Sequence, residues 1–430
     1  MKALKKTITF LMALLLSLAP LTMYAANGTF GGGNGTSVTP YIIEDAADLD
    51  AVRNDLSANY KLSKDIDLSI YLASGVAYSK QGNEGWCPIG DGSTNSMNSY
   101  FTGSFNGDGH KITGLWIVGN RLNFVGLFGE TTNATIENLG VEIDSRGVEG
   151  TYQTGGLVAV QDGGSIKNCY STGDVNGGNG AGGLVGTQLQ GNIENCYTTG
   201  NSRAMNNAGG LVGYQSVGGN INNCYTTGNV SGNSYIGGLV GYQLSGNVRN
   251  CYATGNVSGS SYVGGLVGLN FSGEVSNCFF DIQTTGQEKG IGGTSPNEGV
   301  AGKTTAEMQR QATFAGWDFT NVWGIHENSS YPYLKSLITG ISSIELQNFN
   351  FTAYPNPVAI GQTLYVKYDV DNEQLKDATI EVYNMAGNIV DQLKVQSRFT
   401  PIHIKYASGA YFFVLKRKGE FLKNLKVIVY

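Results

Sequence analysis

Apolar residues recur in short clusters at a nearly constant interval through the middle of the chain. The segment GGLVGTQLQGNIENCYTTG at residues 182–200 returns in close copies from residues 209, 237 and 264, and in looser copies from residues 155 and 125. Internal repetition of this length is typical of a solenoid. The second glycine of the five clearest copies gives a period of 27 or 28 residues: Gly156, Gly183, Gly210, Gly238 and Gly265.

Each repeat contains three short β-type pieces, around GGLVG, around the I-x-N-C-Y block and around G-N-V-S. A unit of this size cannot bury its apolar face alone, whereas stacked units share one continuous core. No proline occurs between Pro88 and Pro296, and a proline inside a parallel ladder would remove a hydrogen bond. The pattern predicts an all-β chain whose central part is a parallel β-helix with one repeat per coil.

Stacking turns each repeat position into a column of like residues. Amide side chains in register can bond from coil to coil at bends, so a structural role is favoured for the amide columns over ligand contact. The aliphatic column is expected in the core. The asparagine column is Asn138, Asn168, Asn195, Asn223, Asn250 and Asn277; the second amide column is Gln161, Gln188, Gln215, Gln243 and Asn270; the aliphatic column is Ile166, Ile193, Ile221, Val248 and Val275.

Five of the six cysteines also form a column, and Cys87 stands apart. Side chains in register point the same way and five cannot all pair, which favours buried free thiols. The even total in an exported protein leaves a disulfide open as the alternative. The spacing lacks the short ligand pairs of a zinc site, so no metal is expected. The column is Cys169, Cys196, Cys224, Cys251 and Cys278.

The residue after each of the first four cysteines in this column is a tyrosine. If the preceding Asn marks a bend that turns Cys inward, alternation turns the tyrosine outward and builds an exposed aromatic column that suits sugar rings. The sequence therefore offers a ligand-binding hypothesis for Tyr170, Tyr197, Tyr225 and Tyr252. The alternative is that these tyrosines cover the flank of the solenoid for stability.

Composition and the N-terminus place the chain among exported proteins. A basic start and an apolar run at residues 8–19 predict a signal peptide over residues 1–25, followed by a glycine-rich linker over residues 26–37. The chain has 63 glycines and only 14% charged residues, yet 41% are hydrophobic, which excludes collagen and disorder. The net charge of −6 gives no electrostatic basis for a nucleic-acid partner.

No catalytic constellation is apparent, so the chain is not expected to be an enzyme. The chain has only three histidines, and His326-Glu327 lacks the second His of a zinc peptidase helix. A polysaccharide lyase or glycosidase remains the enzyme alternative, and it would need a close carboxylate group. Asp65, Asp67 and Asp91 are the acids that could meet in space. The column after the core aliphatic residues offers no carboxylate pair: Lys167, Glu194, Asn222, Arg249 and Ser276.

The GGLVG blocks resemble the GLUG motif, a repeat of bacterial surface and secreted proteins that is associated with β-helices. The resemblance extends into the flanks, and it implies opening coils over residues 38–122, a GLUG-repeat β-helix over residues 123–302 and a C-terminal cap over residues 303–338. In that cap, a short helix from about Thr305 to Ala312 followed by aromatic packing is expected to plug the open ladder of the last coil.

After a linker at residues 339–347, residues 348–430 have alternating strands that predict an Ig-like antiparallel β-sandwich. YPNP from Tyr354, VYNMAGNIV from Val382 and the terminal SGAYFFVLKRKGEFLKNLKVIVY resemble the C-terminal sorting domain of type IX secretion substrates. This resemblance implies a Bacteroidetes-type bacterium, passage through the periplasm, the type IX secretion machinery as a partner, and secretion or attachment at the outer membrane.

Three classes of function follow from these observations. An adhesin-like binding module for carbohydrate or host matrix comes first, because the chain is exported and presents an uncharged repetitive face. A structural surface spacer is the second class and would show a solenoid without a groove. A glycan-active enzyme is the third. No cofactor is expected.

Overall fold

The computed structural model describes residues 29–73, 84–90, 99–119, 123–337 apart from 295 and 297, and 351–430 apart from 369–377, 386, 387, 396, 398, 418 and 419. The chain divides into two compact units, Met1–Leu337 and Ile338–Tyr430. The expected signal peptide and the linker at residues 339–347 lie outside the described residues.

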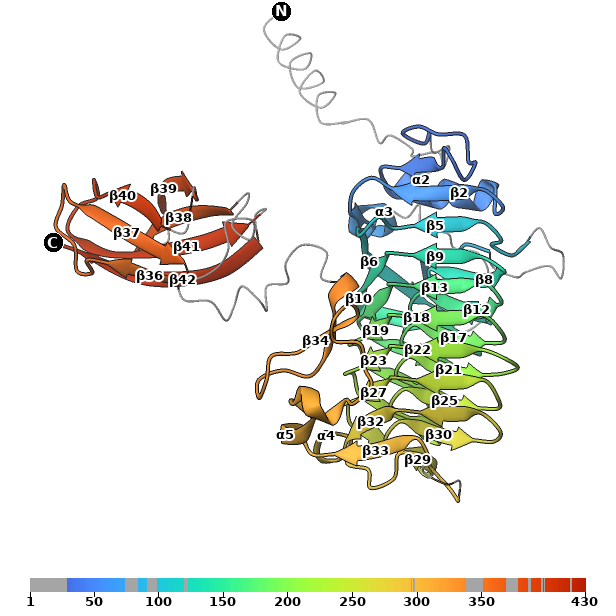
Figure 1. Cartoon of the computed structure of the whole chain (residues 1–430). Helices are drawn as coiled ribbons and strands as arrows, with labels where there is room; N and C mark the ends of the chain where they lie inside the picture. The colour runs from blue at the N-terminus through green and yellow to red at the C-terminus, as the bar shows by residue number, and fades with distance from the viewer. Residues whose placement is uncertain are drawn as a thin grey trace, which may run out of the picture. The chain divides into compact units, whose positions relative to one another are not determined.

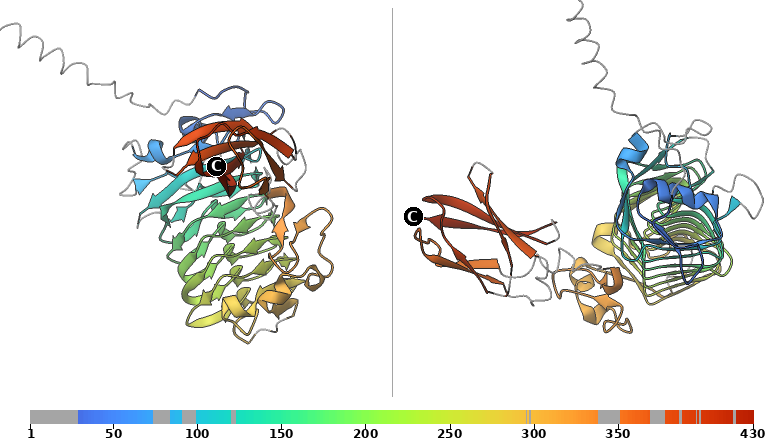
Figure 2. Two further views of the ribbon diagram at one scale, coloured as in Figure 1. Left: turned by 90° about the vertical axis from the view of Figure 1, so that its left-hand side faces the viewer. Right: turned by 90° about the horizontal axis from the view of Figure 1, so that it is seen from above.

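The first unit is a parallel β-solenoid, in which the chain passes through three sheets in every coil (Figure 1). Viewed from above, the coils superimpose around a common interior (Figure 2). The nine-stranded sheet contains β1 (Tyr41–Ile43), β2 (Asn59–Leu62), β5 (Ser104–Asn106), β9 (Thr135–Glu137), β13 (Ser165–Lys167), β18 (Asn192–Glu194), β22 (Asn220–Asn222), β26 (Asn247–Arg249) and β31 (Glu274–Ser276). The six-stranded sheet contains β8 (Phe128–Thr132), β12 (Val158–Asp162), β17 (Val185–Gln188), β21 (Val212–Gln215), β25 (Val240–Gln243) and β30 (Val267–Asn270).

The third sheet is the largest, because the chain contributes two or more strands to it in most coils. All its pairings are parallel except that of β4 (Glu84–Gly85) with β6 (Lys111–Val118). Its other strands are β3 (Ile66–Asp67), β7 (Phe124–Val125), β10 (Gly140–Glu149), β11 (Gln153–Gly155), β14 (Tyr170–Thr172), β15 (Val175–Gly177), β16 (Gly180–Gly182), β19 (Tyr197–Thr198), β20 (Ser202–Gly209), β23 (Tyr225–Thr226), β24 (Val230–Gly237), β27 (Tyr252–Ala253), β28 (Val257–Ser258), β29 (Ser261–Gly264), β32 (Cys278–Asp281) and β33 (Val300–Lys303).

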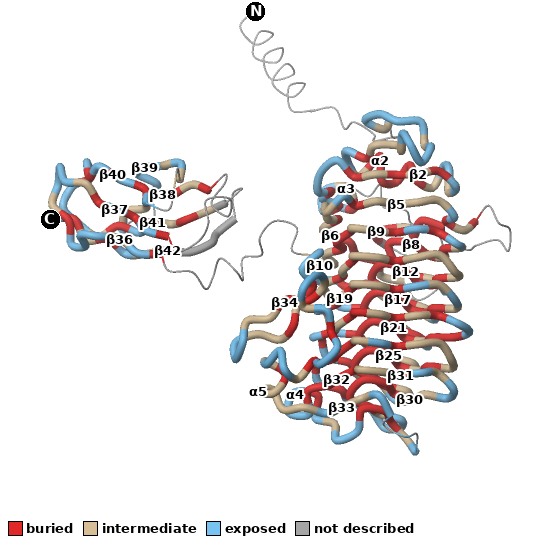
Figure 3. Tube along the Cα trace, viewed as in Figure 1, coloured by how far each residue is buried: buried red, intermediate tan, exposed pale blue. Residues whose placement is uncertain are grey.

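The interior of the solenoid is a stack of apolar columns, as the repeat pattern predicts. Ile166, Ile193, Ile221, Val248 and Val275 are all buried, and the leucine of each GGLVG block is fully buried beside them. Figure 3 shows these buried positions repeating on the inside of successive coils. At the N-terminal end, helix α2 (Ala46–Ala51) and the 3-10 turn Val52–Asn54 add Leu49 and Val52 to the same core. Asp45 begins α2 by accepting hydrogen bonds from the backbone amides of Ala47 and Asp48.

The second glycine of each GGLVG block allows the coils to approach closely. A Cβ atom placed on Gly183 would lie 2.3 Å from the carbonyl oxygen of Gly210, the equivalent residue of the next coil. The same clash repeats at Gly210 and Gly238, at 2.2 Å in each case. Glycine is therefore required here by packing, which explains the large glycine content.

The asparagine column fixes the bend that follows the nine-stranded sheet. Each of its six residues has a positive φ of 50–55°, the left-handed region that Asn tolerates better than most residues. Each side-chain amide also donates a hydrogen bond of 2.9–3.3 Å to the side-chain oxygen one coil earlier, and the series continues down to Asn106. The prediction of amides bonded from coil to coil is confirmed for this column.

The glutamine column is buried, but it bonds differently from the prediction. Gln188, Gln215 and Gln243 donate to the backbone carbonyl of a glycine three or four residues ahead, at 3.0–3.2 Å. Within the described residues, one glutamine bonds to another, Gln215 to Gln188 at 3.1 Å. The longer side chain reaches the carbonyl of its own bend, and that bond replaces the expected ladder.

The five stacked cysteines are free and buried in the core. Each thiol donates to the backbone carbonyl two residues earlier, with Sγ–O distances of 2.9–3.2 Å. Burial raises the pKa of Cys169, Cys196 and Cys251 well above that of an ordinary thiol. These thiols therefore pack as small apolar groups, and a raised pKa disfavours the reactive thiolate.

Short helices and one hairpin follow the repeats. They are α4 (Ile282–Thr285), α5 (Thr305–Met308), the 3-10 turns Gln311–Thr313 and Lys335–Leu337, and the antiparallel pair β34 (Trp323–Gly324) and β35 (Tyr333–Leu334); near the N-terminal coils lies α3 (Ser69–Ala73). The expected helix from Thr305 to Ala312 is thus a single α turn and a separate 3-10 turn. Thr304 and Glu307 form a reciprocal capping box at the start of α5.

The second unit is a sandwich of two antiparallel sheets, as predicted. Its core includes Leu364, Val366, Ile380, Val382 and Phe413, which alternate with exposed residues along their strands. One sheet contains β36 (Phe351–Tyr354), β37 (Thr363–Tyr368) and β40 (Phe399–His403); the other contains β38 (Ala378–Asn384), β39 (Ile389–Lys394), β41 (Gly409–Arg417) and β42 (Glu420–Val429).

Substitution of Asn195 tests the asparagine ladder. Asn195→Ala should lower the free energy of unfolding by about 2–4 kcal/mol. It removes two side-chain hydrogen bonds, and it places alanine in the left-handed region, which alanine tolerates less well than asparagine. Asn195→Gly loses the same bonds but tolerates the backbone, so it should cost only about 1–2 kcal/mol. Urea denaturation of both variants measures the difference. Equal losses would show that backbone strain does not contribute at this bend.

Candidate functional site

The tyrosines that follow the cysteines form a stack on the outside of the solenoid core. Successive rings lie 4.9–5.1 Å apart, and their planes differ by 9°, 6° and 2° along the series Tyr170, Tyr197, Tyr225 and Tyr252. The cysteines point inward and the tyrosines outward, as alternation predicts. Parallel rings at this spacing cover one another's faces, so a ligand beside the stack could reach mainly ring edges and hydroxyl groups.

Residues 304–337, here called the strap, pack along this tyrosine stack. The indole of Trp323 is fully buried, and its centroid lies 6.1 Å from the ring centroids of both Tyr225 and Tyr252. The Tyr252 hydroxyl donates a 2.6 Å hydrogen bond to the carbonyl oxygen of Pro332. Phe314, Trp317 and Leu334 complete the cluster. Burial raises the pKa of Tyr197 to about 12 and raises that of Tyr225 and Tyr252 further.

The strap corrects two expectations from the sequence. It lies along the flank of the solenoid, whereas the sequence predicted a plug at the open ladder of the last coil. That ladder is continued by β33, which pairs in parallel with β32. Tyr252 is only 1% exposed, so the expected exposure fails at this end of the column. The tyrosine stack provides the strap with a wide apolar surface, and the sequence pattern gave no indication of this contact.

The other end of the tyrosine column keeps the binding hypothesis open. Tyr170 and Tyr197 are half-buried, and the Tyr170 ring lies over Gly140, where a Cβ atom would be 2.3 Å from the ring. Binding by these two tyrosines remains a prediction, and the flank-covering alternative agrees with the packing of Tyr225 and Tyr252.

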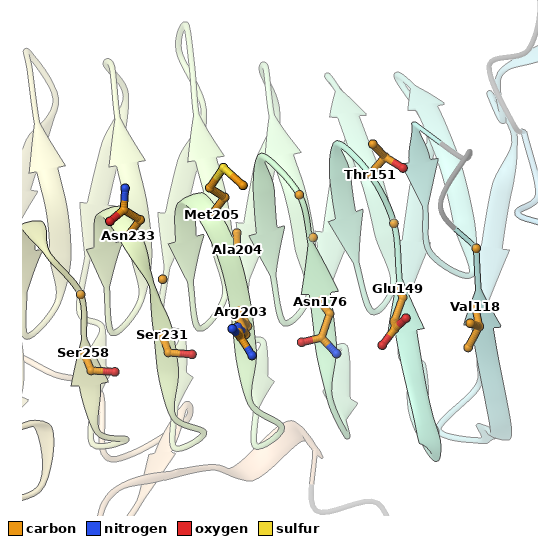
Figure 4. A pocket seen from close by; sticks show the side chains of 16 residues that line it. Val118, Glu149, Thr151, Asn176, Arg203, Ala204, Met205, Ser231, Asn233 and Ser258 are labelled. Atoms are coloured by element: carbon orange, nitrogen blue, oxygen red, sulfur yellow. The ribbon is translucent and has the colours of Figure 1, made fainter.

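A groove of about 1270 Å³ runs along the solenoid at another corner, over the third sheet. Two rows of residues border it, and small residues lie between them (Figure 4). The groove spans six strand levels, roughly 24 Å at the usual spacing between strands. The first row is Val118, Glu149, Asn176, Arg203, Ser231 and Ser258; the second includes Thr151, Gly178, Met205 and Asn233; the floor between them is Gly150, Gly177, Ala204, Gly232 and Gly259.

Sheet register accounts for the groove. Parallel pairing places Glu149 beside Asn176, Asn176 beside Arg203, and Arg203 beside Ser231, so each row is a series of equivalent repeat positions. Ala204 belongs to a small core, and glycine takes the equivalent position in the other coils of the groove. The other members of this core are Val175, Ala181, Ala208, Val230, Ile236 and Val257. Small floor residues therefore leave the backbone accessible between the two rows.

The groove offers hydrogen-bonding groups and two separated charges. Within the described part of the chain, neither Glu149 nor Arg203 has an ion-pair partner. The remaining polar side chains of both rows are amides and hydroxyls. This arrangement suits an extended polar polymer better than a compact apolar ligand. Sequence analysis missed it, although the first-row position changes from Glu149 to Asn176, Arg203 and Ser231 in successive copies while most other columns repeat.

The acids singled out from the sequence do not form a described catalytic pair. Asp65 contacts His110 Nδ1 at 3.1 Å, and Asp67 accepts a hydrogen bond from the amide of Ser69 at 2.8 Å. Asp91 lies outside the described residues. Among the residues that the structure places, no three His, Cys, Asp or Glu side chains gather closely enough to hold a metal ion.

Comparison with protein families agrees with these two units. The GLUG motif matches residues 150–176, 177–202, 232–258 and 259–285, and the secretion system C-terminal sorting domain matches residues 352–430. The chain carries GLUG repeats and a type IX sorting domain. The sorting domain implies export to the cell surface or the medium. In the described residues, no helix is both long and apolar enough to cross a membrane.

Two relatives each match about a third of this chain. A putative Gly-rich membrane protein of Evansella cellulosilytica is 40% identical over 147 residues, which cover 34% of this chain and 16% of that protein. Halomucin of Haloquadratum walsbyi is 38% identical over 151 residues, which cover 34% of this chain and 2% of halomucin. The chain thus spans less than a fifth of the length of either relative. The family matches indicate a repeat protein that is exported to the cell surface or the medium.

Alkaline unfolding tests the contact between the strap and the tyrosines. An unfolded tyrosine releases its proton near pH 10, whereas Tyr197 keeps it to about pH 12. Above pH 10 the unfolded state therefore binds fewer protons, and stability that is fully present below pH 10 should fall as the pH rises to 12. Trp323→Ala should lower stability by about 3–5 kcal/mol at pH 8 and weaken this pH dependence.

The measurement combines the melting temperature from pH 8 to 12 with tyrosinate absorbance. Identical pH profiles for the wild type and Trp323→Ala would contradict a strap that keeps water from the tyrosine rings.

Proposed function

We propose that this protein is an exported, adhesin-like binding module whose GLUG solenoid holds an extended carbohydrate or host-matrix polymer in the groove over the third sheet. The groove is the observation that supports this function. It follows the solenoid axis, has a floor of small residues, and displays Glu149 and Arg203, for which the described residues provide no ion-pair partner. A purely structural spacer has no need of such a channel.

The proposed binding module acts outside the cell, after export. In the proposed route, a signal peptide over residues 1–25 directs the chain to the periplasm, and the sorting domain engages the type IX secretion machinery. The protein is then released or attached at the outer membrane. The acidic net charge of −6 argues against a nucleic-acid partner. Catalysis is not part of the proposal, because Asp65 and Asp67 have other partners and the groove contains a single carboxylate.

Filling the groove tests the binding function without knowledge of the ligand. Ser231→Trp places a large side chain in the first row, and it should weaken binding at least tenfold by steric exclusion. Asn222→Trp is the matched control, because Asn222 lies on the outer face of the nine-stranded sheet. The full-length protein would be tested against neutral polysaccharides, anionic polysaccharides, collagen and fibronectin, with circular dichroism as the check on folding. Equal binding by both variants would overturn the proposal.

Deletion of the sorting domain tests the export route. The solenoid and the sandwich have separate cores, so a chain ending at residue 337 should keep a folded solenoid. We expect this truncated protein to accumulate in the periplasm, and cell fractionation with protease protection would locate it. Normal amounts at the cell surface or in the medium would contradict the role of the sorting domain.

A further inference from the structure

Four tyrosines gather at the corner of the solenoid where β24 and β29 lead into β25 and β30. Tyr214 and Tyr242 lie on the six-stranded sheet with their ring centroids 5.4 Å apart. Tyr235 lies 5.3 Å from Tyr242 and 5.0 Å from Tyr262. These four residues, here called the aromatic corner, form one continuous group of rings.

Two of these tyrosines adopt a backbone conformation that is unfavourable for a bulky residue. Tyr235 and Tyr262 have φ values of 60° and 53°, in the left-handed region. The other ten non-glycine residues with positive φ in the described chain are all Asn or Asp. Parallel pairing of Ala208 with Ile236 makes Asn207 the equivalent of Tyr235 in the preceding coil, and Asn207 has the same conformation.

Core packing does not offset this strain. None of the four tyrosines belongs to a buried core cluster of the described residues, and Tyr262 is 44% exposed. The neighbouring residue Ile236 already fills the interior position. The contacts that these two tyrosines do make are ring contacts within the corner, and strained residues cluster at sites that recognise ligands.

The surroundings of the aromatic corner favour a neutral ligand. The adjacent side chains are the amides of Asn206 and Asn207 and the hydroxyls of Ser234 and Ser261, which lie 2.7 Å apart. Lys289, near Tyr262, donates to the carbonyl oxygen of Gly293. Sugar rings present apolar C–H faces to aromatic side chains and hydroxyl groups to amides, and tyrosine supplies both kinds of contact.

We propose that the aromatic corner is a binding site for a neutral carbohydrate, separate from the groove. Tyr262 provides the exposed ring, and Tyr235, Tyr242 and Tyr214 continue the group of rings behind it. The amides and hydroxyls on β20, β24 and β29 donate hydrogen bonds to the sugar hydroxyls and accept hydrogen bonds from them. A groove ligand and a corner ligand make different contacts, so either site can fail without the other.

The double variant Tyr235→Asn/Tyr262→Asn tests the site. Asparagine is the residue found at the equivalent position 207, and it tolerates the left-handed conformation better than tyrosine. The variant should therefore fold with an unchanged or higher melting temperature, while it loses the aromatic rings. We expect at least a tenfold weaker affinity for neutral polysaccharides. Tyr152→Asn is the matched control, because Tyr152 is an exposed tyrosine outside the corner. The affinity of this control variant for neutral polysaccharides should be unchanged.

Affinity electrophoresis of the full-length proteins in gels containing soluble neutral glucans, mannans or galactans would measure binding, with alginate as the anionic comparison. The proposal is supported by retardation in a neutral gel that the double variant loses and Ser231→Trp keeps. It is overturned if the wild type is retarded only by alginate or by none of the polymers, or if the double variant binds like the wild type. A lower melting temperature of the double variant would also overturn it, since the rings would then act in packing.

Discussion

The hydrogen bonds between stacked asparagine side chains set the geometry on which the solenoid depends. Each Asn makes the chain turn where few other residues could, and each amide fixes its coil to the previous one. Because one residue of slippage would exchange the inner and outer faces of a strand, this bond also keeps the valines, leucines and cysteines inside. The apolar core provides the driving force, but the amide ladder selects the register in which that core forms.

The same register creates both the tyrosine stack and the groove, although the two surfaces differ in sequence character. Columns that repeat one residue type, such as Asn, Cys and Tyr, satisfy a contact that recurs at every coil. The first row of the groove changes from Glu149 to Asn176, Arg203 and Ser231. Where the fold requires no particular residue at a repeat position, the side chain there can serve ligand binding instead. In this chain, variation within an otherwise regular column therefore indicates a candidate binding surface.

Much of the solenoid could be predicted from the sequence, because each coil repeats contacts that one period reveals. The inward cysteines, the buried aliphatic column and the asparagine ladder all follow from alternation and stacking. The strap could not be placed in this way, since its contact with Tyr225 and Tyr252 joins a non-repeating segment to a repeating one. The aromatic corner was also missed, because Tyr235 and Tyr242 occur at different positions of the repeat and meet only where two sheets adjoin.

The strap also changes how the solenoid would respond to mechanical force. In an array whose units touch only their neighbours, tension at one end peels away the terminal unit first. Here Trp323 contacts rings from two successive coils, and Trp317 donates to the carbonyl oxygen of Asn277 in the next. A pull applied at Leu337 is therefore distributed over contacts with three coils. The strap therefore acts as an anchor point between the solenoid and the segment of chain that follows it.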